Sequence, residues 1–234
     1  MIVVNGDSFV HEYHLDPEKR WSTIIKADAN LAIGAGSNDR TFTTTIEYIH
    51  NHDVRTLIIG WTDWNRSYFN KSNGSRYKLI GGDAIDELLG DNHNDPDVAK
   101  FYLTKVFNEF TQLKNTLVQM LHTQELCKLK KIKLINFATV FDAGDLNNEN
   151  IIRIAKNAFM SRRNKDEEAM GIKYNMNLLH TYINKLDSSC WINNNVFSSM
   201  KTILQNYPKH SETDRHIGVE GSNKWAEILS KHLH

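Results

Sequence analysis

Four short apolar runs, separated by stretches with helical spacing, constrain the possible folds of this chain more than any other feature. The runs cover residues 1–5, 29–33, 56–61 and 132–138. Short apolar runs bounded by turn residues are typical of buried strands. Strands that alternate with helices form parallel sheets covered on both faces, so the chain is predicted to be an α/β domain with a central parallel sheet. Such sheets bind ligands beyond the carboxyl ends of their strands.

Helical spacing of apolar side chains predicts helices in four places: over 17–27, from about residue 38, over 97–130 and over 220–233. Two longer segments stand apart from this alternation. Residues 62–96 are polar, aromatic and glycine-bearing, which predicts a loop or lid, whereas residues 143–206 are mostly helical in pattern. We expect a single domain over residues 1–234, with 62–96 as the loop or lid and 143–206 as a helical insertion before the C-terminal block.

Charge and composition argue against several classes of partner. The chain has 28 basic and 28 acidic residues, so its formal net charge is zero and no basic excess indicates a nucleic-acid partner. No apolar run approaches the roughly 20 residues that span a bilayer, and the N-terminus lacks the features of a signal peptide. We therefore expect a soluble cytoplasmic protein without a membrane partner, whose Cys127 and Cys190 are separate reduced thiols.

A serine directly follows the first predicted strand, in the stretch Asn5-Gly6-Asp7-Ser8-Phe9. A glycine beside such a serine allows a tight turn that presents the hydroxyl to a cleft, where a base can activate it as a nucleophile. The alternative interpretation is that Asp7 or Ser8 caps a helix after the strand. The triplet Gly-Asp-Ser alone does not decide between the two.

His216 lies just before the last predicted helix and follows Asp214 by two residues. A histidine in this position can act as a general base oriented by the carboxylate. The alternative is a solvated loop histidine, and we interpret His210 in that way. Gly36 lies in the loop after the second strand, where its main-chain N–H is a candidate donor to an oxyanion or an ordinary turn donor.

The order and spacing of these blocks resemble the SGNH, or GDSL-type, hydrolase superfamily. The blocks are Gly-Asp-Ser near the N-terminus, Asn-x-x-x-x-x-Gly at 30–36, Gly-x-Thr-Asp at 60–63 and Asp-x-His-x-x-x-x-Gly at 214–221. The resemblance implies a three-layer flavodoxin-like fold of the SGNH-hydrolase type, ester hydrolysis and no metal or organic cofactor. It makes Ser8 the nucleophile and His216 the base. Asp214 would orient the base, and the N–H groups of Ser8 and Gly36 would form part of the oxyanion hole.

Two positions depart from the pattern of the superfamily. Thr62 stands where the third block has an asparagine that completes the oxyanion hole, so the shorter threonine hydroxyl is expected to donate there. The last block reads Asp-x-His where the family has Asp-x-x-His, with Thr213 at the usual acid position. Loss of one oxyanion donor costs about 10²–10³ in turnover, so both departures bear on catalysis more than on fold.

Further side chains near these blocks are candidate substrate contacts, namely Asp7, Trp64 and Arg66. Trp61 is expected in the core. For Arg66 the alternative is an ion pair with Asp63. His11, Glu12, His14 and Asp16 follow Ser8 and suggest a metal site, but they lack a recognisable ligand spacing, so we favour a polar loop and expect no metal.

These residues lead to three hypotheses of function. The first is a serine esterase or deacylase acting on a small or carbohydrate-borne ester, and the second is a non-catalytic SGNH-like binding or assembly module. The third is an acyltransferase that uses the same residues. The richness in asparagine, lysine and isoleucine, with the Gly-Trp-Thr block, also resembles SGNH-like proteins of bacteriophages, which would place the chain in a host cytoplasm. The sequence leaves the oligomeric state open.

Overall fold

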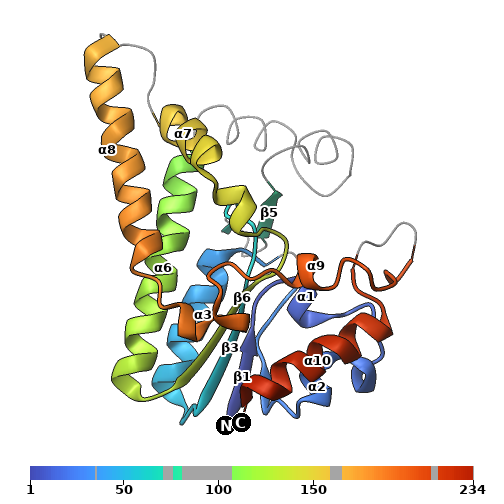
Figure 1. Ribbon diagram of the computed structural model, residues 1–234. Coiled ribbons are helices and arrows are strands. Elements are labelled where there is room, and N and C mark those ends of the chain that lie inside the picture. Colours follow the sequence, from blue (N-terminus) through green and yellow to red (C-terminus); the bar gives the residue numbers. More distant parts are fainter. Residues whose placement is uncertain (35, 71–75, 81–106, 159–164, 212–215, 234) are drawn as a thin grey trace.

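The computed structural model describes residues 1–34, 36–70, 76–80, 107–158, 165–211 and 216–233 of the chain. Its main sheet has four parallel strands in the order β2-β1-β3-β6 (Figure 1). The strands are β1 (Ile2–Asn5), β2 (Ala29–Asn30), β3 (Thr56–Trp61) and β6 (Lys133–Ala138). Each lies within a predicted run, although β2 has only two residues. The predicted α/β fold with a central parallel sheet is confirmed.

The strand order matches the first four positions of the flavodoxin-like order 2-1-3-4-5. Where a fifth strand would lie, the edge of β6 makes two isolated parallel bridges to described residues, Asn136 with Trp191 and Ala138 with Ser199. The segment that supplies these partners contains three short helices: η4 (Ser188–Cys190), η5 (Ile192–Asn194) and α9 (Met200–Ile203). The carboxyl half of β6 is therefore covered by irregular backbone.

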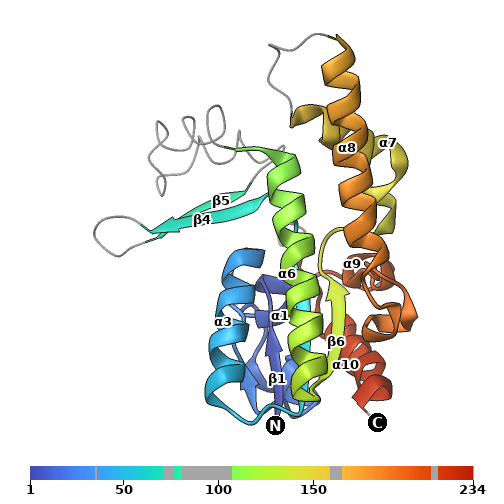
Figure 2. The same cartoon turned by 90° about the vertical axis from the view of Figure 1, so that its left-hand side faces the viewer.

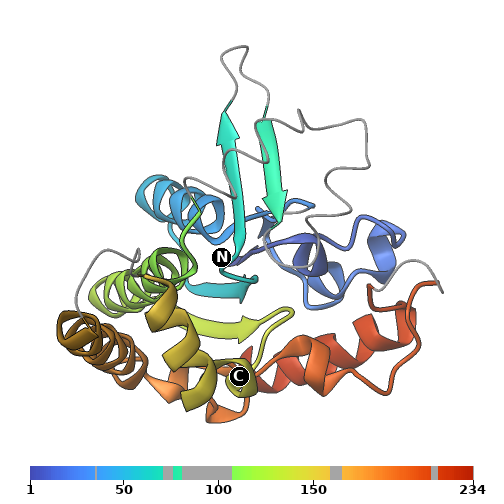
Figure 3. The ribbon, with the colours of Figure 1, turned by 90° about the horizontal axis from the view of Figure 1, so that it is seen from above.

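Helices cover both faces of the sheet, as Figure 3 shows from above. On one face lie α3 (Asn38–Asn51) and α6 (Glu109–Lys130), and on the other lie α2 (Trp21–Ile24) and α10 (Val219–Leu233). The strand residues alternate between these layers because successive side chains of a strand point to opposite faces. In β3, Leu57 and Ile59 pack with the first layer and Ile58 with the second.

Two of the predicted helices differ from the observed ones. The segment 17–27 divides into a 3₁₀ helix, η1 (Pro17–Lys19), and α2, because Arg20 between them is extended with φ −75° and ψ 135°. The helix expected over 97–130 is found as α6, which begins at Glu109 after the Asn108 side chain caps it by accepting from the Thr111 N–H. Residues 97–106 of that prediction lie outside the described residues.

The segment 62–96 was expected to be a loop or lid, but part of it is an antiparallel hairpin. Its strands are β4 (Arg66–Asn70) and β5 (Arg76–Ile80), which pair from Arg66 with Ile80 to Asn70 with Arg76. Figures 2 and 3 show the hairpin projecting away from the main sheet. The first strand reads Arg-Ser-Tyr-Phe-Asn and does not alternate polar with apolar residues, so the alternation typical of a strand did not mark it. The rest, 71–75 and 81–96, lies outside the described residues.

The segment 143–206, expected to be helical, is helical for much of its described length. It contains η3 (Ala143–Leu146), α7 (Asn148–Asn157) and α8 (Lys165–Asn184) ahead of the short helices beside β6. Helices α7 and α8 pack against α6, and α8 extends well past the end of the sheet (Figure 1). This insertion thus broadens the layer formed by α3 and α6.

No helix in the described part of the chain is both long enough and apolar enough to cross a lipid bilayer.

Candidate active site

The turn after β1 places Ser8 at the start of a short helix, α1 (Ser8–His11). Asp7 is the N-cap of α1, and its Oδ1 accepts a hydrogen bond from the Phe9 N–H at 3.0 Å. Gly6 permits the turn because it has φ 153° and because a Cβ there would clash with Val10 and the carbonyl oxygen of Gly60. The capping interpretation of Gly-Asp-Ser is met by Asp7, and Ser8 is the first residue of the helix that Asp7 caps.

Ser8 and His216 lie in hydrogen-bond contact although 208 residues separate them, with 2.8 Å between Ser8 Oγ and His216 Nε2. Ser8 is buried except for 6% of its surface. A neutral imidazole whose Nε2 carries no hydrogen accepts the serine hydroxyl hydrogen, which is the geometry that a general base needs. The expected partner of this histidine, Asp214, lies outside the described residues.

The backbone around His216 is held by several hydrogen bonds. Its carbonyl accepts from the His210 N–H at 2.9 Å, and the Gly218 N–H donates to the Pro208 carbonyl at 3.0 Å. His14 adds a contact from the loop after α1, because its Nε2 lies 2.9 Å from the Ile217 carbonyl oxygen. A carbonyl oxygen only accepts, so Nε2 of His14 must carry the hydrogen. The first two bonds lie within residues 208–218, whereas the side chains of His14 and Ser8 join this segment to the N-terminal part of the chain.

Aromatic rings surround the imidazole of His216. The ring centroids of Phe9, Tyr13 and His14 lie 4.8, 5.8 and 4.9 Å from that of His216. His210 is exposed, as expected of a solvated residue, and its ring centroid lies 4.9 Å from that of His14. Tyr13 is 55% exposed, so its ring borders the site and also faces solvent.

Three of the four residues that suggested a metal site bond different partners. Glu12 Oε2 accepts from the Trp21 N–H at 2.7 Å, His14 bonds the Ile217 carbonyl, and Asp16 pairs with Lys19 at 2.7 Å. Burial raises the pKa of the Glu12 carboxyl to about 8, against the lowering effect of its hydrogen bonds. Glu12 therefore lies beneath the Ser8 turn as a buried acid that is largely protonated at neutral pH.

Asp7 is the centre of a buried hydrogen-bond network. Its Oδ2 accepts from Thr62 Oγ1 at 2.7 Å, from Arg66 Nη1 at 2.9 Å and from Thr139 Oγ1 at 3.0 Å. These donors come from the loops after β3 and β6 and from the start of β4. The Asp7 side chain is 0% exposed, so it joins loops and does not contact substrate, which corrects one expectation. Arg66 pairs with Asp7, where the sequence suggested Asp63.

The expected oxyanion donors differ in what they contact. The Thr62 hydroxyl has a single hydrogen, which goes to Asp7. The Gly36 N–H donates to the Ile33 carbonyl at 3.2 Å and closes a turn. The Ser8 N–H, the first donor of α1, has no acceptor among the described residues. In this conformation, only the Ser8 N–H of the three expected donors is unoccupied.

Thr62 is fixed in its orientation by Asn38, the first residue of α3. The Asn38 Nδ2 donates to the Thr62 carbonyl and its Oδ1 accepts from the Thr62 N–H, both at 2.9 Å. The tryptophan at the end of β3 and the one after the strand are both buried. Trp61 lies in the core as expected, and Trp64 is 6% exposed with its ring centroid 5.3 Å from that of Phe141. A buried ring cannot stack on a substrate, so Trp64 is a core residue and not a substrate contact.

Two residues of the site were not anticipated in these roles. Thr139 directly follows β6, and the rule that ligands bind beyond the carboxyl ends of parallel strands points to the loop after the fourth strand as much as to the other three. His14 had been considered only as a metal ligand or a polar loop residue. Its packing against the segment of His216 depends on contacts between the two ends of the chain.

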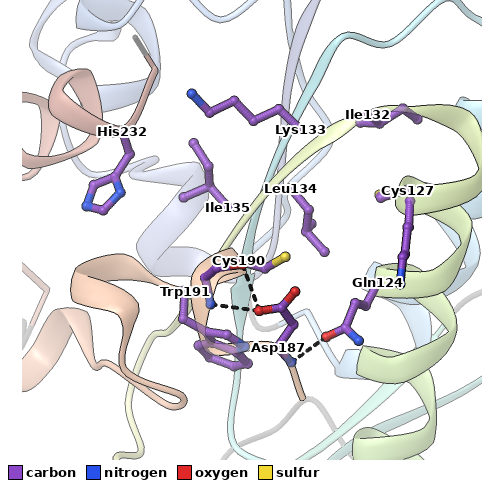
Figure 4. A pocket seen from close by; sticks show the side chains of 12 residues that line it. Gln124, Cys127, Ile132, Lys133, Leu134, Ile135, Asp187, Cys190, Trp191 and His232 are labelled. Atoms are coloured by element: carbon purple, nitrogen blue, oxygen red, sulfur yellow. Dashed lines mark hydrogen bonds between the residues drawn. The ribbon is translucent and has the colours of Figure 1, made fainter. Parts of the chain in front are cut away.

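The cavity that the described residues enclose most clearly lies elsewhere (Figure 4). It has a volume of about 380 Å³ and is lined by residues such as Cys127, Lys133, Cys190 and His232. Lys133 is in register with Thr56, and Thr56 with Ile2, so the cavity lies at the amino end of the sheet, opposite the Ser8 turn. Its shape carries no information about the Ser8 chemistry.

No family model and no curated protein matches the chain. Solved structures similar to it over nearly its full length include a GDSL-like lipase from Bacteroides thetaiotaomicron, with 12% identity, coverage of 98% of this chain and 85% of that chain, and a TM-score of 0.46. TesA is 10% identical to this chain, and the match covers 99% of this chain and 97% of TesA with a TM-score of 0.48. A catalytic mutant of an acetylxylan esterase from Geobacillus stearothermophilus is 11% identical, and the match covers 99% of this chain and 93% of the esterase with a TM-score of 0.46. At these identities the similarity concerns the fold alone.

Proposed function

We propose that this chain is a serine ester hydrolase in which Ser8 is the nucleophile and His216 the general base. The observation that carries the proposal is the 2.8 Å contact between Ser8 Oγ and His216 Nε2. Serine is a poor nucleophile until a base removes its proton, and a contact of this length meets the geometric requirement. The location at the carboxyl end of β1 also fits the place where parallel sheets bind ligands.

The reaction proceeds in two halves. Ser8 Oγ forms a bond to the ester carbonyl carbon while its proton passes to His216 Nε2, and the carbonyl π electrons move to the oxygen. The Ser8 N–H donates to this oxyanion. The bond to the alcohol then breaks, and His216 returns the proton to the departing oxygen. A water molecule, deprotonated by His216, releases the acyl group from Ser8 by the same steps.

In the proposal, two residues hold the imidazole of His216 in its orientation. Asp214 is the proposed acid partner of the imidazole, as its position in the sequence indicates. His14 is a second support, because its bond to the Ile217 carbonyl ties the residue after His216 to the loop that follows α1. A substitution of either residue is expected to lower turnover through His216 without removing the nucleophile.

The proposed substrate is an ester of a small alcohol or of a sugar. Tyr13 supports this class, because its half-exposed ring lies 5.8 Å from the ring of His216. An exposed aromatic ring offers an apolar face to the C–H groups of a sugar. The exposed imidazole of His210, which packs against His14, offers polar atoms to the hydroxyl groups.

Hydrolysis of p-nitrophenyl acetate and of acetylated xylosides tests the proposal. The wild-type protein is expected to release acetate from both, and Ser8→Ala is expected to release none above background. Product analysis with and without a free sugar acceptor separates hydrolysis from acyl transfer. Full activity of the Ser8→Ala variant would remove this mechanism.

A non-catalytic binding module is the second candidate, and one observation favours it. The Thr62 hydroxyl and the Gly36 N–H both donate within the protein, which leaves few donors for an oxyanion. Such a module would bind an acetylated sugar without cleaving it. Tight binding of the sugar by wild-type protein, with no acetate released over hours, would favour this candidate over the hydrolase.

A further inference from the structure

Arg66 has a charge and unused donors at the point where the Ser8 turn meets β3. Its Nη1 donates to Asp7 Oδ2 at 2.9 Å, and Asp7 precedes Ser8 in the chain. A guanidinium has five N–H donors. No further acceptor for this guanidinium is found among the described residues. Within the described part of the chain, the guanidinium is therefore only partly engaged.

The two ends of this ion pair differ in exposure. The Asp7 side chain is 0% exposed, whereas that of Arg66 is 16% exposed. The carboxylate thus anchors the pair in the interior, while the Arg66 side chain keeps part of its surface exposed. A buried carboxylate with three donors on one oxygen also restricts the guanidinium to one orientation, since the Thr62 and Thr139 hydroxyls occupy the other directions around Oδ2.

The Thr62 hydroxyl and the Arg66 guanidinium are neighbours, since both bond Asp7 Oδ2. Thr62 directly follows β3, which pairs with β1 so that Ile59 is in register with Asn5 at the start of the Ser8 turn. The threonine cannot donate to an oxyanion while its only hydrogen points to Asp7. The guanidinium beside it has hydrogens to spare and carries a positive charge.

We propose that Arg66 is a further catalytic residue, which donates a charge-assisted hydrogen bond to the oxyanion formed on attack by Ser8. The inference rests on the proposed hydrolase function. As the Ser8 Oγ–carbon bond forms, the carbonyl oxygen gains a negative charge, and the Ser8 N–H and an Arg66 N–H bond it together. Asp7 keeps the guanidinium in place before the reaction, so little reorganisation is needed in the transition state. The charge on Arg66 does not change during the cycle.

The alternative role for Arg66 is only to neutralise the buried Asp7 carboxylate. An Asp7→Asn background separates the two roles, because asparagine can still cap α1 but carries no charge for Arg66 to neutralise. In this background Arg66→Gln removes the guanidinium without leaving a buried unpaired carboxylate. The comparison is therefore between Asp7→Asn and the double variant Asp7→Asn with Arg66→Gln.

The test measures kcat and KM for p-nitrophenyl acetate in both variants, together with their melting temperatures. Adding Arg66→Gln to Asp7→Asn is expected to lower kcat about 10²-fold while KM changes by less than about threefold, since removing one oxyanion donor costs this much. Affinity for an alkylboronic acid, which forms a tetrahedral anion on the serine, is expected to fall in parallel. Arg153→Gln is the matched control, because it removes an arginine–carboxylate pair with Glu109 at 2.6 Å on the surface, and it is expected to leave kcat unchanged.

Equal kcat and equal boronate affinity in Asp7→Asn and in the double variant would overturn the role of Arg66 while leaving the hydrolase intact. A wild-type protein that neither hydrolyses the ester nor binds the boronate at Ser8 would instead remove the proposed function, and the inference about Arg66 with it.

Discussion

The two ends of the sheet bury different kinds of group. At the carboxyl end, the Asp7 carboxylate is fully enclosed and accepts hydrogen bonds from three side chains and one backbone N–H. At the amino end of β6, a cavity of about 380 Å³ is bordered by Cys127 and Cys190 (Figure 4). The first end is packed and polar, and the second is hollow. The contrast separates an end held by directed hydrogen bonds, where the proposed nucleophile lies, from an end with empty volume.

The pKa values of the two cysteine thiols support the same contrast between the ends of the sheet. Burial raises the pKa of the Cys127 thiol to about 12 and also raises that of Cys190, so neither is a thiolate at neutral pH. The thiolate is the reactive form of cysteine. The cavity therefore contains two unreactive nucleophiles, whereas the Ser8 hydroxyl has a base within 2.8 Å.

The largest difference between the two ends is expected in catalysis. Ser8→Ala and His216→Asn should each lower kcat/KM for p-nitrophenyl acetate by about 10³-fold or more, because each removes one half of the proton transfer. Ser189→Ala, at the cavity, is the matched control and should change it less than twofold. Equal losses at Ser189 and Ser8, with unchanged circular dichroism, would reverse the comparison.

A substitution of Thr139 tests how much the Asp7 network contributes at the carboxyl end of the sheet. Thr139→Val removes a buried donor to Asp7 and should lower kcat about tenfold and the free energy of unfolding by about 1–3 kcal/mol. The control is Thr202→Val, which removes a threonine–aspartate bond of 2.8 Å at the surface and should change stability by less than about 0.5 kcal/mol. Urea unfolding and ester kinetics measure the two effects. Indistinguishable results for the two valine variants would argue against the network.

The exposed ring of Tyr13 extends the comparison to substrate binding. Tyr13→Ala should raise KM for an acetylated xyloside about five- to tenfold, since loss of an aromatic contact costs about 1 kcal/mol, and Tyr13→Phe should keep it. Ethyl acetate has no ring to stack on, so its kcat/KM should stay within twofold in both variants. Tyr174→Ala, an exposed tyrosine on α8, is the control. A rise in KM for both esters would contradict a stacking role.

Each end of the sheet also buries a titratable group. At the end that carries Ser8, this group is Glu12. Its pKa of about 8 in the folded protein lies above the usual 4.5, so it favours folding when protonated. This contribution is complete below about pH 4.5 and is lost as pH rises through 8. Glu12→Gln should therefore flatten the fall of melting temperature between pH 6 and 9, while the wild type loses a few kcal/mol at most. Parallel pH profiles of melting temperature would contradict the buried acid.

The smallest effect is expected at the cavity. Cys127→Ala removes a buried sulfur that is 1% exposed and should lower stability by about 1 kcal/mol. Activity should stay within twofold of wild type, because the cavity lies at the opposite end of the sheet from Ser8. A loss of activity in this variant at full stability would show that the cavity acts on the reaction.

Local patterns predicted most of the sheet, because short aliphatic runs such as 56–61 have few alternatives to a buried strand. Block order also led to the pairing of Ser8 with His216, which no local pattern contains. The hairpin β4–β5 was missed because the segment 62–96 around it is rich in polar residues and glycine, and this composition was taken as the sign of a loop. The partner of Arg66 depends on which loops meet at one edge of the sheet. Contacts of this kind arise from tertiary packing, so the sequence does not reveal the network around Asp7.

The measurement that tests the central claim most directly is labelling of the folded wild-type protein with a fluorophosphonate, followed by peptide mass mapping. Such a reagent bonds only to a serine that a neighbouring base activates. The account predicts rapid, stoichiometric modification at Ser8 alone and its loss in His216→Asn. An unlabelled Ser8 in protein that melts cooperatively, or equal labelling in wild type and His216→Asn, would contradict it.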